Sequence, residues 1–201
     1  MQVPRPAEIT ADAHLLETCV ASEEILKGHF LQVRRDTVSL PDGKHTTREY
    51  VIHPGAVMII AQLDDGRLVL ERQFRYPVRV VMIEFPAGKL DAGEDSLHCA
   101  QRELLEETGY SAREWARAGV LHPVISYSTE HIDIWFARGL TEGQRNLDAG
   151  EFLDVFTATP AELLGWCGNG KVTDAKTLTG MLWLQNVASG AWTLDWHVAL
   201  P

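Results

Sequence analysis

The sequence predicts an α+β domain with a mixed sheet, preceded by a small antiparallel β segment. Short runs typical of strands outnumber helical stretches, and turn signals such as Pro41-Asp42-Gly43-Lys44 join neighbouring runs as hairpins. Helical stretches separate the other runs, which favours a mixed sheet. The 201 residues suffice for one such domain and a small appendage. We expect residues 1–54 to form the β-rich segment and residues 55–201 the larger domain.

The predicted strands are short runs of apolar and β-branched residues bounded by Pro, Gly or Asp. The run Ala56–Leu63 is apolar almost throughout and therefore predicts a buried strand. Pro86 ends another strand, because proline has no N–H to donate to a neighbouring strand. In chain order, the predicted strands span residues 29–40, 45–53, 56–63, 67–74, 80–85, 118–126, 131–137 and 152–157.

Start and stop signals predict the helices. The first spans about residues 96–108, with Asp95 or Ser96 as its N-cap and Gly109 where a C-terminal glycine is expected. Pro160 opens a second helix at the first helical position, where proline is favoured. The last predicted helix spans about residues 174–187. The tail, residues 189–201, has no clear assignment.

Composition excludes several classes of function. The net charge of −10 argues against a nucleic-acid duplex as partner, because such binding depends on cations that displace counterions. No apolar run approaches the length of a membrane span, and the N-terminus has no apolar core of a signal peptide. Three cysteines without CxxC spacing are typical of reduced thiols. We therefore expect a cytoplasmic protein that binds neither nucleic acid nor membrane.

The first predicted helix carries an unusual concentration of negative charge. Glu103, Glu106 and Glu107 fall within an arc of about 100° on an ideal α-helix. A solvated acidic face is one interpretation, since each exposed like-charge pair costs only about 0.2–0.5 kcal/mol. The other is a site for a hard divalent cation such as Mg²⁺ or Mn²⁺, which prefers carboxylate and carbonyl oxygens.

The stretch from Gly88 to Tyr110 resembles the Nudix box. The pattern of the box begins with a glycine, which is followed at fixed spacing by a glutamate. After further fixed spacings come Arg-Glu and an apolar residue, then Glu-Glu, and finally a glycine and an apolar residue. This sequence fills every fixed position, with tyrosine in place of the usual last aliphatic residue. The matching residues are Gly88, Glu94, Arg102-Glu103-Leu104, Glu106-Glu107 and Gly109-Tyr110.

The flanking residues resemble the ADP-ribose pyrophosphatase group of the same superfamily, and the similarity covers most of residues 28–187. The resemblance implies a Nudix-type α/β/α sandwich with a mixed sheet. It also implies a homodimer, with residues 1–54 as the dimerisation element. The stretches that carry this resemblance are residues 48–57, 71–77, 84–90 and 174–177.

The same resemblance implies a set of residues that bind metal and carry out catalysis. The backbone carbonyl of Ala87 and the carboxylates of Glu103, Glu107 and Glu106 would hold Mg²⁺, with Mn²⁺ as the alternative. Arg102 can orient its neighbour Glu103 through charge-assisted hydrogen bonds, and we group it with Glu106 among the catalytic residues. Glu151, on a loop after the box, is the expected general base, with Asp154 as the second choice.

Four residues are expected to bind the substrate. Arg75 resembles the arginine that grips it, Leu90 lies where the family packs it against the box loop, and Arg48 could reach a partner subunit's site. Glu130 is retained in a loop that departs from the family pattern. In that loop Ser126 replaces a glycine, which leaves the substrate open.

The expected activity is Mg²⁺-dependent hydrolysis of a nucleoside diphosphate sugar, with ADP-ribose cut to AMP and ribose 5-phosphate. A pyrophosphate is multiply anionic, so a cation would help a hydroxide to attack it. One alternative keeps the chemistry and changes the substrate to another nucleotide sugar, such as GDP-mannose, or to an oxidised nucleotide. The other is a nucleotide-sensing binding module, which should carry a basic DNA-binding appendage; none is visible in the sequence.

Overall fold

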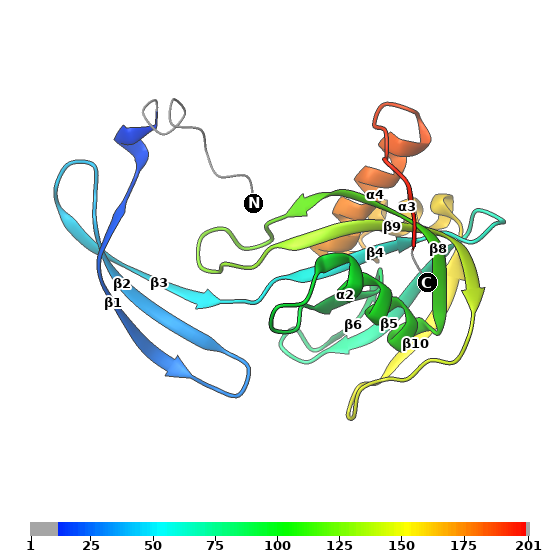
Figure 1. The fold of residues 1–201 in the computed structure, drawn as a ribbon, viewed down its shortest axis with the longest axis horizontal. Helices are drawn as coiled ribbons and strands as arrows, with labels where there is room; N and C mark the ends of the chain where they lie inside the picture. The colour runs from blue at the N-terminus through cyan, green and yellow to red at the C-terminus, as the bar shows by residue number, and fades with distance from the viewer. Residues whose placement is uncertain (1–11, 200–201) are drawn as a thin grey trace. The chain divides into compact units, whose positions relative to one another are not determined.

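The computed structural model describes residues 12–199, which belong to two compact units. The first unit comprises the chain up to His53 together with Val124–Glu130, and the second comprises Pro54–Pro123 and the chain from His131 onward (Figure 1). Between residues 12 and 199, no helix is both long and apolar enough to cross a membrane.

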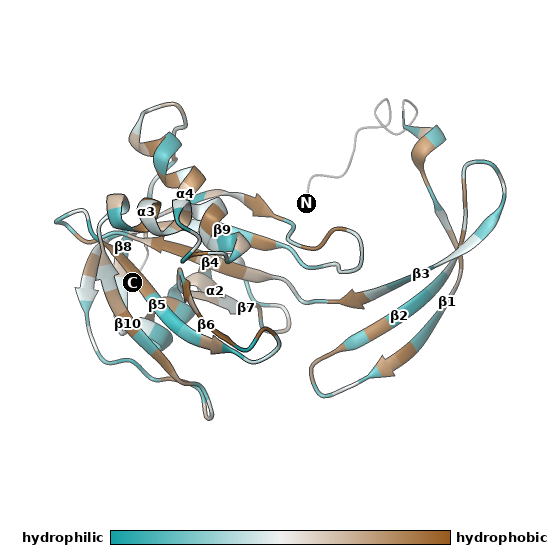
Figure 2. Cartoon of the chain, turned by 180° about the vertical axis from the view of Figure 1, so that it is seen from behind, coloured by the Kyte–Doolittle hydropathy of each residue, from teal (hydrophilic) through white to brown (hydrophobic). Residues whose placement is uncertain are grey.

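The N-terminal unit is a three-stranded antiparallel sheet in the order β1-β2-β3. Val38 is the one buried residue among those that the structure describes in this unit. Hydrophobic and hydrophilic segments follow each other along these strands (Figure 2). Because nearly all of their residues are exposed or half-buried, the sheet has almost no core of its own. Its elements are η1 (Ala13–Leu15), β1 (Thr18–Lys27), β2 (Gln32–Ser39) and β3 (His45–Ile52).

The hairpin of β2 and β3 confirms the two strands predicted on either side of the Pro41–Lys44 turn. β1 was not predicted, because all ten of its residues are exposed and its apolar residues do not alternate. This strand forms through pairing with β2, so only the tertiary structure reveals it.

The second unit contains a five-stranded sheet, β11-β8-β9-β4-β7, and a three-stranded sheet, β10-β5-β6. β4 and β9 are parallel and every other neighbouring pair is antiparallel, which confirms the predicted mixed sheet. The strands are β4 (Ala56–Ala61), β5 (Leu68–Arg75), β6 (Val80–Glu84), β7 (Ala87–Lys89), β8 (Tyr110–Leu121), β9 (Ile132–Glu142), β10 (Leu153–Ala158) and β11 (His197–Val198).

Helices cover both faces of the large sheet. All six residues of β4 are buried, and successive side chains of a strand point to opposite faces. Val57 and Ile59 pack in a hydrophobic cluster with Ala100 of α2. Met58 and Ile60 pack in a second cluster with residues of α3 and α4. The fold is therefore the predicted mixed α+β sandwich, with helices α2 (Ser96–Glu103), α3 (Pro160–Gly168) and α4 (Ala175–Ala188).

The helix caps form as predicted, but the first helix does not continue as an α-helix. The Asp95 carboxylate accepts the Leu97 N–H at 2.9 Å, and Gly109 ends the segment in the left-handed conformation with φ of 80°. Between them, α2 ends at Glu103 and a π-helix, η2 (Leu104–Thr108), follows. A π-helix bonds i to i+5, so the later residues face other directions than on an ideal α-helix.

Several predicted strand limits were wrong. The strand expected over residues 118–126 is β8, which begins at Tyr110 and ends at Leu121, and residues 123–127 form a turn. A register shift between Arg117 and Gly119 interrupts its alternation, so local pattern did not show its full length. β7, β11 and the extension of β9 to Glu142 were not predicted either. Each depends on pairing with a neighbouring strand.

Candidate active site

One guanidinium joins the loop after β7 to helix α2. Arg102 donates from Nε and Nη2 to the two carboxylate oxygens of Glu94, each at 2.9 Å. Its Nη1 reaches Glu103 at 2.9 Å and Glu106 at 3.0 Å, and Nη2 also reaches the Lys89 carbonyl at 3.2 Å. The Arg102 cation holds the pKa of Glu94 well below its usual range. Arg102 therefore fixes both the loop and two carboxylates of the predicted site.

Glycine at position 88 makes room for Glu103. A Cβ at Gly88 would lie 1.8 Å from Cδ of Glu103 and 1.9 Å from its Oε1, so any side chain would displace this carboxylate. Burial raises the pKa of Glu103, although the neighbouring Arg102 opposes the change. The box glycine and the box glutamate are thus in direct contact.

Glu107 lies apart from the carboxylates that Arg102 binds. It is 4% exposed, and its Oε2 accepts the Ala87 N–H at 3.1 Å. Its carboxyl group also lies within hydrogen-bonding reach of that of Glu71 on β5. The expectation of one shared face for Glu103, Glu106 and Glu107 is therefore only partly correct, because the π-helix turns Glu107 toward β5.

Glu71 is a site residue that the sequence reasoning missed. It is 2% exposed, and its Oε1 has no hydrogen-bond partner. Burial raises the pKa values of both Glu71 and Glu107, and each charge raises the other further. A signal for it was present: Glu71, Gln73 and Arg75 are spaced by two on a strand and therefore share one face.

The structure brings Glu151 to these carboxylates. The amide of Gln73 on β5 donates to Oε1 of Glu151 at 3.2 Å. The negative charge of Glu151 raises the pKa values of Glu71, Glu103 and Glu107, as expected for a carboxylate that faces all three.

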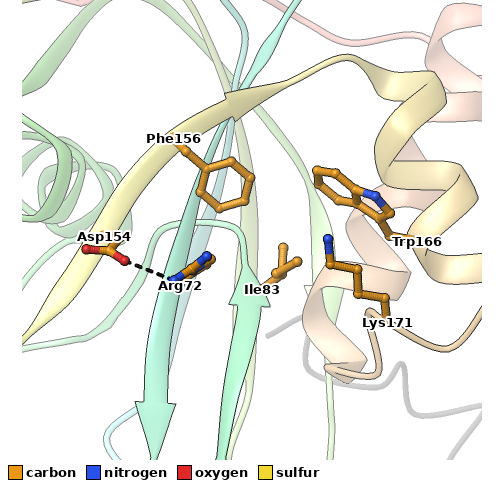
Figure 3. A pocket seen from close by; sticks show the side chains of 6 residues that line it. All are labelled: Arg72, Ile83, Asp154, Phe156, Trp166 and Lys171. Atoms are coloured by element: carbon orange, nitrogen blue, oxygen red, sulfur yellow. Dashed lines mark hydrogen bonds and ion pairs between the residues drawn. The ribbon is translucent and has the colours of Figure 1, made fainter.

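Asp154, the second choice for the base, does not join this group. It pairs with Arg72 at 3.2 Å, and both line a cavity of about 340 Å³ with Phe156 and Trp166 (Figure 3). Arg72 follows Glu71 on β5, so its side chain points to the opposite face of the strand. This cavity is therefore separate from the carboxylate site.

Arg75, the predicted substrate-binding arginine, is held by a second residue that the sequence reasoning missed. Its Nε and Nη2 donate to the two oxygens of Glu84 at 2.7 and 2.8 Å. Lys176 at the start of α4 pairs with the same carboxylate. Burial alone would raise the pKa of Glu84, but the two cations outweigh it and lower the pKa. Glu84 also pairs in register with Glu71 across β5 and β6.

The remaining predicted substrate residues have contacts within their own units. Leu90 is half-buried in the second unit, and its N–H donates to the Gly55 carbonyl at 3.2 Å. Arg48 belongs to the N-terminal unit, where it donates to Glu17 at 2.9 and 2.5 Å. Glu130, also in that unit, is half-buried, and its N–H donates to the hydroxyl of Ser128. The structure thus gives Arg48 a carboxylate partner that the sequence did not predict.

The donor set of this site suits a hard cation. Among residues 12–199, no three Asp, Glu, His or Cys side chains converge on one point as they stand. Mg²⁺, however, is usually bound by one or two carboxylates together with water and substrate phosphates. Glu107 and Glu71 supply two buried carboxylates, one with an unpartnered oxygen, and no lysine or arginine forms an ion pair with either among the described residues. The residues present therefore fit a divalent cation.

Comparisons with known proteins agree with this arrangement. A family model described as NUDIX domain matches residues 52–179, and one described as nucleoside diphosphate sugar hydrolase N-terminal domain matches residues 17–51. The chain is 36% identical over 173 residues to an ADP-ribose pyrophosphatase of Bacillus subtilis, covering 85% of this chain and 94% of that one.

Two further similarities are informative. A methanol dehydrogenase activator of Bacillus methanolicus is also 36% identical over 173 residues, covering 84% of this chain and 92% of that protein. A crystal structure of an ADP compounds hydrolase superposes with a TM-score of 0.79 at 22% identity, covering 88% of this chain and 97% of that chain. This last likeness shows that the fold is shared.

Proposed function

Because the chain belongs to the NUDIX family, we propose that it is a hydrolase that cleaves the pyrophosphate bond of an ADP-sugar. ADP-ribose is the proposed substrate, and AMP and ribose 5-phosphate are the products. The similarity to an ADP-ribose pyrophosphatase along almost its whole length supports this choice. The observation that carries the proposal is the buried pair Glu71 and Glu107, which forms no ion pair with a basic side chain among the described residues.

The proposed cation is Mg²⁺, with Mn²⁺ as an alternative, held by the Ala87 carbonyl and by Glu103, Glu107 and Glu106. When bound, it would supply positive charge that neutralises the phosphates and acidifies the attacking water. Arg102 keeps Glu103 and Glu106 in place through the ion pairs described above.

Glu151 is the proposed general base, and its position beside the buried carboxylates supports this role. It would accept the proton of the water that attacks one phosphorus. Arg75 would bind the phosphates, since its guanidinium has five N–H donors and Glu84 fixes its orientation. Leu90 would pack against the substrate, and Arg48 and Glu130 are proposed to complete the binding site.

A hydrolysis panel with Mg²⁺ tests the proposal. It should contain ADP-ribose, other ADP-sugars, GDP-mannose and 8-oxo-dGTP, with EDTA as the control. We expect AMP to be released from ADP-ribose faster than product from any other compound, and EDTA to abolish the release. Faster hydrolysis of GDP-mannose or 8-oxo-dGTP would support the proposed reaction but show that ADP-ribose is not the preferred substrate. No hydrolysis by folded protein would favour the nucleotide-sensing module.

We also propose that the N-terminal unit, residues 1–54 as the sequence suggested, mediates a homodimer. Its sheet exposes Val20, Ile25 and Leu26 at 40% or more, together with Phe30 and Leu31, and such apolar surface is typical of an interface. Size-exclusion chromatography with light scattering should give twice the chain mass of 22.4 kDa. A mass of one chain would contradict this proposal.

The three unpaired cysteines support a cytoplasmic location, which stays a prediction.

A further inference from the structure

Glu71 lies outside the box, and although it begins the stretch 71–77 that carries the resemblance, the resemblance assigns it no role. It belongs to β5, whereas the box lies between Gly88 and Tyr110. Its side chain is buried as completely as that of Glu107, and the two carboxyl groups lie within hydrogen-bonding reach of each other. Oε1 of Glu71 is buried and has no hydrogen-bond partner. A buried oxygen of this kind costs free energy unless some positive group approaches it.

The neighbouring strand shows how this protein neutralises a buried carboxylate when it uses its own cations. Glu84 pairs in register with Glu71 and is also 2% exposed. Arg75 and Lys176 both form ion pairs with Glu84. Glu71 has no such pair among residues 12–199, although the negative charges of Glu84, Glu107 and Glu151 all face it. Two cations therefore form ion pairs with Glu84, whereas Glu71 feels the Arg75 charge only from a distance and forms no ion pair among the described residues.

We propose that Glu71 is a further ligand of the divalent cation, which it binds through Oε1 beside Glu107. The inference rests on the proposed function only in that a cation occupies this site. Two carboxylates with the Ala87 carbonyl and water are a sufficient oxygen set for Mg²⁺ or Mn²⁺.

The test measures Mn²⁺ affinity without nucleotide, by isothermal titration calorimetry or by electron paramagnetic resonance of free Mn²⁺. Glu71→Gln keeps the size of the side chain and its reach to Glu107, but removes the charged ligand. We expect the Kd for Mn²⁺ to rise about 10- to 100-fold. Glu114→Gln is the matched control, because Glu114 loses the same charge but pairs with Arg113 and Arg138 outside the site. Its Kd should equal that of the wild type.

Thermal unfolding keeps the proposal testable if the variant is difficult to purify. In EDTA, Glu71→Gln should unfold at the wild-type temperature or above, because it removes a buried carboxylate that faces three others. Added Mn²⁺ should then raise the Tm of the wild type more than that of the variant. Glu71→Asp, which keeps the charge but shortens the side chain, should give an intermediate Kd and an intermediate shift.

The outcomes separate this inference from the proposed function. Equal Mn²⁺ affinity of wild type and Glu71→Gln would overturn the inference and leave Glu71 as a buried neighbour of Glu107. Wild-type protein that binds Mn²⁺ but hydrolyses nothing in the panel would overturn the proposed function, while the Glu71→Gln comparison would still decide the ligand. Wild-type protein that binds no Mn²⁺ would overturn both.

Discussion

Two groups of carboxylates in the second unit have different surroundings. Glu94, Glu103 and Glu106 share one guanidinium, that of Arg102, at distances of 2.9 to 3.0 Å. Glu71 and Glu107 are more deeply buried, and no arginine or lysine forms an ion pair with them among the described residues. The negative charges of Glu94, Glu103 and Glu106 are therefore balanced by Arg102, a residue of the chain itself. The proposed cation would draw ligands from both groups: Glu103 and Glu106, which Arg102 holds, and Glu107 and Glu71, which form no ion pair.

Burial alone does not explain the difference. Glu84 and Glu71 are neighbours on adjacent strands with equal exposure, yet burial and nearby carboxylates raise the pKa of Glu71, whereas two cations lower that of Glu84. The choice of residues around each carboxylate sets its charge. An acid kept without a cation costs stability, and such costs are typical of functional sites.

The largest effect on activity is expected from a substitution in the pair Glu71 and Glu107, which forms no ion pair among the described residues. Glu107→Gln removes one charge of that pair, and we expect the rate of AMP release from ADP-ribose to fall about 100- to 1,000-fold. The circular dichroism spectrum should match that of the wild type, because the glutamine can still accept the Ala87 N–H. Activity near the wild-type level would show that the cation assignment is wrong.

The second effect is on stability and concerns the carboxylates that pair with Arg102. Arg102→Ala leaves Glu94 and Glu103 without their cation in a partly enclosed site, so we expect a loss of about 2–3 kcal/mol in the free energy of unfolding. Urea denaturation measures it. The control is Arg72→Ala, because Arg72 and Asp154 form an exposed pair, which typically contributes less than about 1 kcal/mol. Equal losses for the two variants would contradict the role given to Arg102.

The smallest effect on stability is expected at Gly88. A methyl group there meets the end of the flexible Glu103 side chain, which can rotate away, so the free energy of unfolding should change by less than about 1 kcal/mol. The displaced carboxylate should nevertheless lower the hydrolysis rate about 10- to 100-fold. Gly165→Ala, where a Cβ meets nothing within 4 Å, should change neither quantity appreciably. Full activity of Gly88→Ala would mean that the position of Glu103 does not matter.

Much of the fold was readable in the sequence. The caps at Asp95 and Gly109 and the helix start at Pro160 formed as predicted, since each depends on hydrogen bonds or dihedral angles within a few residues. The buried strand β4 followed from its continuous apolar run. β1 and the true limits of β8 could not be predicted, because their residues acquire a strand conformation through pairing with distant segments.

The candidate site also has a part that the sequence predicted and a part that it did not. The spacing of Gly88, Glu94, Arg102 and the glutamates fixed the box, and the structure adds that Arg102 joins the loop to the helix. The roles given to these residues stay predictions. Where Glu71 and Glu84 lie relative to the box could not be read from local spacing, because strands β5 and β6 precede it in the chain.

The sequence by itself determined the helix boundaries set by capping, the central buried strand and the family to which the box belongs. Local signals suffice there, because a helix cap or a loop spacing involves residues that are neighbours in the chain. Only the tertiary structure decided that the π-helix turns Glu107 toward β5 and that Glu71 meets it there with one oxygen unpartnered. Such a contact between a strand and a helix depends on how the two pack, and packing joins residues that no local pattern relates.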